Sequence, residues 1–147
     1  MDTVEAQRRM ESRFPALLKV GYCVASDEDS GYNCIAWAAG RSDQWWEPSP
    51  GYYWPDGSPA IDTVEALMQV FRDLGYEVCA NGHAESGFQK IAIFAEDEIY
   101  THAARQLDDG KWTSKIGAWE DIEHSSCEGL EGNEYGKVRH FMKRPKT

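Results

Sequence analysis

The chain has 147 residues, 41% of them hydrophobic and 12% aromatic, a composition that predicts one folded domain and excludes a disordered chain. Its formal net charge of −10 argues against nucleic acid as a partner, because phosphate binding needs clustered Lys and Arg. No apolar run has the length of a membrane span, which excludes the membrane as a partner, and the polar N-terminus lacks a signal core. We therefore expect a cytoplasmic protein, with export as an effector that needs no classical signal left open.

The N-terminal part of the chain is predicted to be helical. Apolar positions among charged ones predict an amphipathic helix from residue 3 to about residue 19, whose last part is disturbed by Pro15. Residues 21–33 mix Gly, Ser and Asp and are interpreted as a loop. A short Ala- and Trp-rich helix is expected at 34–39, where Gly40 provides a C-terminal cap.

A longer helix is expected after an aromatic loop. Residues 41–60 are rich in Trp, Pro and Gly, as is typical of a loop. The segment Asp62-Thr63-Val64-Glu65 that follows has the spacing of a capping box. The apolar stripe behind it predicts a helix that ends at Gly75.

From residue 76 the hydrophobic period changes to two, which predicts strands. They are expected at about 76–80, 88–95, 99–107, 111–116 and 135–143. Residues 119–130 are interpreted as a loop or a short helix. Helices followed by strands predict a single α+β domain over 1–147, helical to about residue 75, with the helices packed on one side of an antiparallel sheet.

Cys34 has the most informative setting in the chain. It follows a Gly/Asn turn and lies in the first turn of the expected short helix, where free N–H groups and the helix dipole stabilise a thiolate. A cysteine nucleophile also needs a base and donors for the oxyanion. The backbone N–H of Cys34 is one such donor, and the side chain of Asn33 or Gln44 is a second.

His102 is the candidate base. It begins a predicted strand in which Ala104 and Gln106 share its face, so its ring is expected to lean over the helix N-terminus. Asp121, just beyond the next predicted strand, can accept the other imidazole N–H and fix the tautomer.

A cysteine at a helix start, a histidine on a later antiparallel strand and an acid downstream together resemble the papain-like cysteine hydrolase superfamily. The resemblance covers about residues 30–125 and is closer to small bacterial amidase-like and toxin-like branches than to papain. It implies a papain-like fold with Cys34 as nucleophile and His102 as base. The third residue is Asp121 by order, or Ser114 on the strand that follows the histidine.

The implied reaction is acyl transfer through a thioester. Peptide or isopeptide hydrolysis, side-chain deamidation and transamidation all fit, with a protein or peptide substrate and no cofactor or metal. Four cysteines without a CxxC pair likewise favour reduced thiols over a zinc site or a disulfide framework. The oligomeric state is left open.

Other residues carry alternative interpretations. Trp45 and Trp46 in the aromatic loop either fold over the sheet as an auxiliary core or form a wall of the substrate cleft. His83 and His124 are interpreted as solvated loop residues. Cys34 itself has the alternative of a buried core residue.

The rival hypothesis is an inactive α+β binding module. Its acidic surface and exposed aromatic side chains would then dock a basic protein partner, as an immunity or adaptor protein would. The reactivity of the Cys34 thiol discriminates between the two classes.

Overall fold

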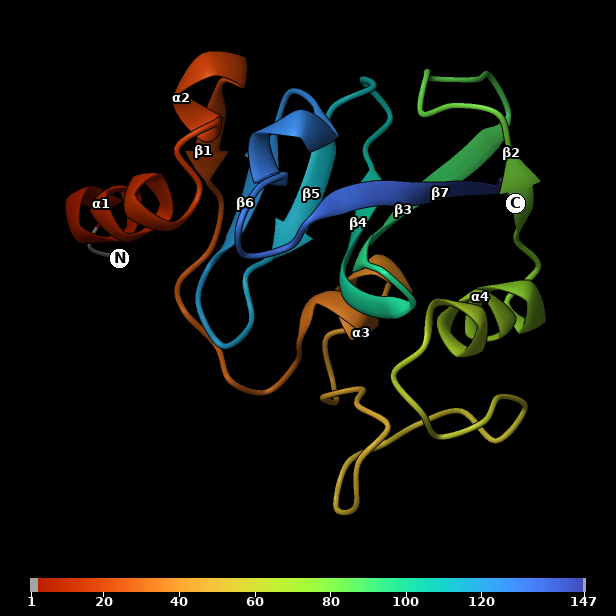
Figure 1. Cartoon of the computed structure of the whole chain (residues 1–147). Helices are drawn as coiled ribbons and strands as arrows, with labels where there is room; N and C mark the ends of the chain where they lie inside the picture. Colours follow the sequence, from red (N-terminus) through yellow and green to blue (C-terminus); the bar gives the residue numbers. More distant parts are fainter. Residues whose placement is uncertain (1–2, 147) are drawn as a thin grey trace.

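The computed structural model describes residues 3–146, which contain a seven-stranded antiparallel sheet and several helices (Figure 1). The strands are β1 (Tyr22–Val24), β2 (Glu77–Cys79), β3 (Phe88–Glu96), β4 (Ile99–Gln106), β5 (Trp112–Lys115), β6 (Asp121–His124) and β7 (Lys137–Pro145). The helices are α1 (Thr3–Arg13), α2 (Leu17–Val20), α3 (Cys34–Ala38), α4 (Val64–Asp73) and the 3-10 helix η1 (Cys127–Leu130). The order in the sheet is β1-β6-β5-β4-β3-β7-β2, so β4, which carries His102, is the central strand.

The α+β class and the antiparallel sheet are confirmed, but three expectations about the elements are wrong. The first predicted helix is divided into α1 and α2, because Pro15 lies between them. The predicted loop at 21–33 contains β1, and the stretch 119–130 contains β6 as well as η1. These two strands pair with each other at the edge of the sheet.

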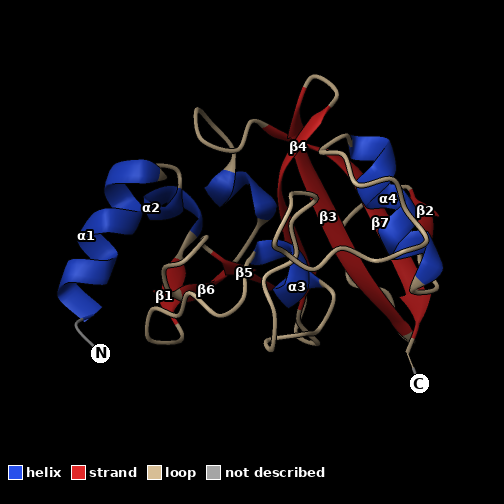
Figure 2. Ribbon diagram, turned by 90° about the horizontal axis from the view of Figure 1, so that it is seen from below, coloured by secondary structure: helices blue, strands red, loops and turns tan. Residues whose placement is uncertain are grey.

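Helical segments pack against both faces of the sheet, which corrects the expectation of a one-sided arrangement. One face, here called the α3 face, buries Ile91, Ile93 and Ala103 against α3 and α4. The other, the α1 face, buries Ala92 and Phe94 together with residues of α1, α2 and η1. Figure 2 shows α4 alongside β3 and β7, and α1 with α2 near β1 at the opposite end of the sheet.

The α4 helix is well defined at both ends. Its N-cap is Thr63, whose hydroxyl accepts the N–H of Ala66 at 3.2 Å, so the cap lies one residue beyond Asp62 of the predicted box. Gly75 follows the helix with a φ of 97°, a conformation that glycine adopts without strain. The buried face includes Phe71, which contributes about 2 kcal/mol on leaving water.

The central strand β4 has one edge that is only partly paired, and this feature positions the candidate site. β5 pairs with β4 only at Arg105 and Gln106 and then diverges. Further along the same strand, the N–H of Tyr100 donates to the carbonyl of Asp62 at 3.1 Å. The edge of β4 between these two contacts faces α3.

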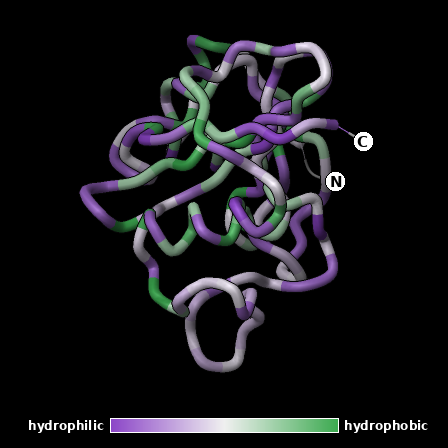
Figure 3. The backbone as a smooth tube through the Cα atoms, turned by 90° about the vertical axis from the view of Figure 1, so that its right-hand side faces the viewer, coloured by the Kyte–Doolittle hydropathy of each residue, from purple (hydrophilic) through white to green (hydrophobic). Residues whose placement is uncertain are grey.

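The aromatic loop at 41–60 lies below α3 and α4 in Figure 1 and at the bottom of the view in Figure 3. Its trace in Figure 3 is mainly white to purple, whereas the body of the fold carries the green hydrophobic segments. None of the helices within residues 3–146 is long and apolar enough to cross a membrane.

Candidate active site around Cys34

Asn33 fixes the start of α3. Its side-chain oxygen accepts the N–H groups of Ala36 at 3.3 Å and Trp46 at 3.0 Å, and its amide donates to the carbonyl of Trp46 at 2.8 Å. The side-chain oxygen and one amide N–H of Asn33 thus cap α3 and anchor the aromatic loop. Gln44, the other side-chain oxyanion donor considered from sequence, is exposed.

Lys115 holds the segment before Cys34 against the sheet. This role could not be predicted from the sequence, because a lysine on a short strand usually faces water. Its side chain is fully buried, and its ammonium donates to the carbonyls of Asp29, Tyr32 and Gly117. The ammonium lies 4.5 Å from the centre of the Tyr32 ring. Its positive charge also acts on the nearby Cys34 thiol.

The α3 helix bridges β4 and β5 by side-chain contacts where these two strands diverge. The indole N–H of Trp37 donates to the hydroxyl of Thr113 on β5 at 2.9 Å. On the other side, the Arg105 Nε on β4 donates to the carbonyl of Trp37 at 3.2 Å, and the guanidinium lies 5.0 Å from the Trp37 ring centre. Cys34, at the first position of this helix, is thereby held at the open edge of β4.

Cys34 is a partly exposed residue, but its sulfur is buried, close to the backbone N–H groups of Ala103 and Ile35. Burial of the sulfur nevertheless raises the pKa of Cys34 to about 11, while these N–H groups and the charge of Lys115 act in the opposite direction. The expected stabilisation of a thiolate is therefore wrong for this conformation. A helix of five residues has too weak a dipole to offset the desolvation.

His102 is fully buried on the α1 face, opposite Phe94 of β3 in the strand register. Its ring stacks on Tyr135 with a centroid distance of 4.2 Å and an interplanar angle of 7°, and it meets the edge of Phe94 at 5.2 Å. Within residues 3–146 neither ring nitrogen has a hydrogen-bond partner. Burial, together with His124, lowers the pKa of His102 well below its usual value, so the imidazole is neutral.

Cys34 lies close to the backbone of β4 next to His102, although no hydrogen bond joins the side chains of Cys34 and His102 in the described part of the chain. The N–H that approaches the sulfur belongs to the peptide between His102 and Ala103. The His102 ring packs against Phe94 of the α1 face, whereas Cys34 packs against the core of the α3 face, so the imidazole has to turn past the edge of β4 to reach the thiol.

Neither residue considered for the third triad position contacts His102. The Asp121 carboxylate accepts the hydroxyl of Tyr32 at 3.3 Å, and its strand partner is Lys115. The Ser114 hydroxyl is 2.8 Å from Nε2 of His124. The hydrogen-bonded relay expected from Cys34 through His102 to Asp121 is thus not formed in this conformation.

From the sequence, His124 is expected to be a solvated loop residue. In the structure it is instead a buried residue at the end of β6. Its Nδ1–H donates to the carbonyl of Ser126 at 2.9 Å, which leaves Nε2 to accept the Ser114 hydroxyl. Burial lowers the pKa of His124 to about 4. No sequence signal marked this burial, because it depends on the long-range pairing of β6.

The two neighbouring tryptophans differ. Trp46 is 5% exposed and belongs to the core beneath α3, which corrects its assignment to the substrate-binding wall. Trp45 is partly exposed, and its indole N–H donates to Glu47 at 3.1 Å. Trp45 is therefore the member of the pair that a ligand can contact.

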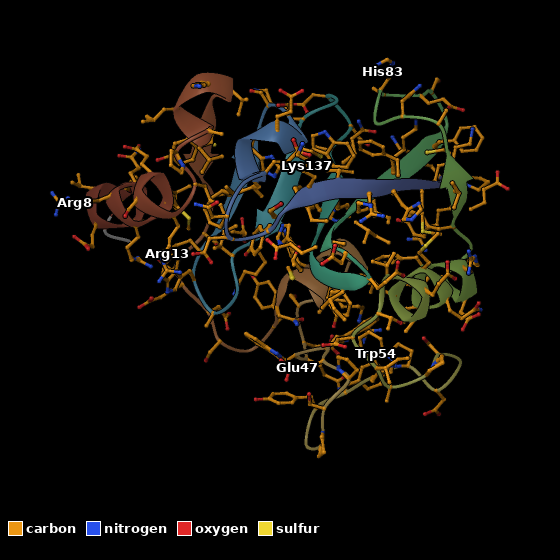
Figure 4. All side chains as sticks on the ribbon, in the orientation of Figure 1. Arg8, Arg13, Glu47, Trp54, His83 and Lys137 are labelled. Carbon is orange, nitrogen blue, oxygen red and sulfur yellow. The ribbon has the colours of Figure 1, made fainter. Side chains whose placement is uncertain are left out.

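A groove lies near the other end of the open β4 edge. It has a volume of about 510 Å³, and Glu47, Asp62 and Tyr100 are among its lining residues. Tyr100 is three residues from Ala103 on β4, which corresponds to about 10 Å along a strand. In Figure 4 the labelled Glu47 and Trp54 lie below α3 and α4 in this region.

Cysteines and metal ligands elsewhere form no comparable site. All four cysteines are free, and Cys127 is buried. Across residues 3–146, no group of three or more His, Cys, Asp or Glu side chains is arranged to hold a metal ion.

Residues 23–143 match the family model described as a domain of unknown function (DUF7689). The chain belongs to this family. The matched span includes Cys34, Ala103 and Tyr135. No curated protein and no solved structure matches the chain.

Proposed function

We propose that this protein is a papain-like cysteine hydrolase or acyltransferase that acts on a peptide, isopeptide or side-chain amide. The observation that carries the proposal is the position of Cys34. Cys34 is a partly exposed residue at the start of a helix, and its sulfur lies close to the backbone of the central strand, beside a buried histidine whose ring nitrogens have no partner among the described residues. Buried polar groups without partners are uncommon in folded proteins and concentrate at functional sites.

The proposed reaction begins with attack by Cys34 on the amide carbonyl. The sulfur–carbon bond forms while the thiol proton passes to His102, and the same proton then goes to the departing amine as the carbon–nitrogen bond breaks. Water or a second amine attacks the thioester and releases the thiol. The backbone N–H of Cys34 stabilises the oxyanion.

His102 acts as a general base in this scheme, not as one half of a preformed ion pair. With a neutral imidazole and a thiol pKa of about 11, the proton moves during attack and not before it. The ring must first leave its stack with Tyr135 and turn toward the sulfur. The substrate chain then extends along the open edge of β4 toward the groove at Tyr100.

Turnover of a panel of peptides, isopeptides and glutamine-containing peptides tests the proposal, with amine and ammonia release read by mass spectrometry. Cys34→Ala is expected to lower turnover by at least about a thousandfold. Cys79→Ala is the matched control, because Cys79 is also a free, partly exposed cysteine. Turnover that survives in Cys34→Ala rules the proposal out.

The second candidate is the inactive binding module, and two observations favour it. Burial raises the pKa of Cys34, and the stack with Tyr135 keeps His102 off the thiol. Under this hypothesis His102→Ala leaves the reactivity of Cys34 unchanged, and a basic protein binds to the acidic surface. Pull-down with a basic protein at low and high salt, in the Cys34→Ala variant, measures that binding independently of chemistry.

A further inference from the structure

The loop between η1 and β7, residues 131–136, is here called the strap. It is closed at its base by paired backbone hydrogen bonds between Gly132 and Gly136, at 2.9 and 2.8 Å. The Glu131 carboxylate adds a further bond by accepting the N–H of Val138 at 2.9 Å. In Figure 1 the strap is the blue segment that leads into β7, and in Figure 4 the labelled Lys137 marks its end.

Tyr135 at the end of the strap covers His102. The two rings are nearly parallel, 7° apart, and Phe14 of the N-terminal segment lies 5.0 Å from the Tyr135 ring centre on another side. The Thr101 hydroxyl, one residue before His102, donates to the carbonyl of Tyr135. Ring and backbone of Tyr135 are thus both attached to the strand segment that carries the candidate base.

Besides these contacts of Tyr135, the strap is tied to the end of α1 at the surface, by the ion pair of Arg13 with Glu134 at 3.4 Å, in which both side chains are about half exposed. Exposed pairs of this kind contribute little to stability. Tyr135 itself is partly exposed, and a small cavity of about 190 Å³ lies beside it, next to Trp119. The ring therefore has space to move out of the stack.

We propose that Tyr135 is a positioning residue that holds His102 in a resting orientation, and that displacement of the strap frees the imidazole to reach Cys34. This inference rests on the proposed function and adds its regulation. The resting stack explains how a fully buried imidazole keeps both nitrogens without a protein partner: the aromatic contact stabilises the ring in place of hydrogen bonds. A substrate that lifts the strap removes that contact, and the ring is then free to turn past the open edge of β4 toward the thiol.

The test is the rate at which iodoacetamide labels Cys34 at pH 7, followed by peptide mass spectrometry. In this reaction a sulfur–carbon bond forms, the carbon–iodine bond breaks, iodide leaves and the thiol proton passes to His102. Tyr135→Ala is expected to raise the rate by about five- to tenfold, because loss of the aromatic stack shifts the equilibrium between the stacked and the released His102 ring by about this factor. Tyr135→Phe keeps the stack and is expected to label at the wild-type rate.

The double variant Tyr135→Ala/His102→Ala separates release of the base from simple exposure of the thiol. If the strap acts through His102, the gain seen in Tyr135→Ala disappears in the double variant. A gain that persists there, or no gain in Tyr135→Ala, overturns the inference. Where Tyr135→Ala does not fold, Tyr135→Leu replaces it, because it keeps apolar volume in the strap without the aromatic stack.

The two proposals fail in different ways. If Cys34→Ala loses turnover but the labelling gain does not depend on His102, the proposed function stands and the strap inference is wrong. If turnover survives in Cys34→Ala, the proposed function is wrong whatever the labelling shows. If the gain in labelling rate depends on His102 but the protein shows no turnover, the strap still determines the orientation of the histidine. That orientation then has no role in catalysis.

Discussion

His102 and His124 are both buried among the strands of the α1 face, yet their surroundings are opposite in kind. His124 uses both ring nitrogens, one as donor to Ser126 and one as acceptor from Ser114. His102 uses neither and is held by aromatic rings. A satisfied histidine contributes to stability through its hydrogen bonds, whereas an unsatisfied one costs stability and is the better candidate for chemistry. The predictions below test this difference, from the largest expected effect to the smallest.

The same substitution at the two positions is expected to give unequal losses. His124→Phe leaves the Ser114 hydroxyl and the Ser126 carbonyl without partners in the interior, so the free energy of unfolding falls by about 3 kcal/mol. His102→Phe removes no hydrogen bond and keeps an aromatic ring between Phe94 and Tyr135. It is expected to remain within about 1 kcal/mol of the wild type. Urea unfolding of both variants measures the difference, and equal losses would remove the distinction.

The buried state of His124 also predicts how stability depends on pH. Its pKa is about 4 in the folded protein and near 6.5 in the unfolded chain, so the unfolded state binds more protons between these values. The contribution of His124 is complete above pH 6.5 and is lost as the pH falls toward 4, for a total of about 3 kcal/mol. The lowered pKa of His102 acts in the same direction.

His124→Gln isolates this contribution, because glutamine does not titrate. The variant is expected to lose less stability than the wild type between pH 6.5 and 4, while carboxylates contribute equally to both. Parallel pH profiles of thermal unfolding in the two proteins would show that His124 is not protonated on unfolding in this range.

Ser114→Ala is expected to have the smallest effect. It leaves Nε2 of His124 without its donor and lowers the free energy of unfolding by about 1 kcal/mol. Because Ser114 does not contact His102, the labelling rate of Cys34 is expected to stay unchanged. A tenfold slower labelling in Ser114→Ala would give Ser114 the orienting role that its place after the histidine strand suggested.

The elements with local signals could be predicted from the sequence, and those fixed by distant partners could not. The start of α3 at Cys34 and the strand with His102 follow from a turn and from hydrophobic alternation, both readable in a few residues. β1 and β6 have three and four residues and are defined by pairing with each other and with β5. Segments this short carry too little periodicity to be recognised.

Burial explains the errors at the site. The sequence placed His102 beside Cys34 and Asp121 beside His102, because order along the chain does not show which face of a sheet a side chain takes. The register between β3 and β4 shifts between Phe94 and Ala95, because Thr101 is an extra residue on β4 next to His102, and such a shift has no sequence signature. The same limit applies to Trp46, which its neighbour Trp45 resembles in every local respect.

The pH profile of Cys34 labelling, compared between the wild type and His102→Ala, tests the central claim most directly. A thiol with a pKa of about 11 and no base would label slowly at pH 7, with a rate that rises tenfold per pH unit. If His102 takes the proton, the wild type shows an additional labelling component that is flat between about pH 6 and 8, and His102→Ala lacks it. Identical profiles that rise together toward pH 11 would contradict the claim that His102 is the base for Cys34.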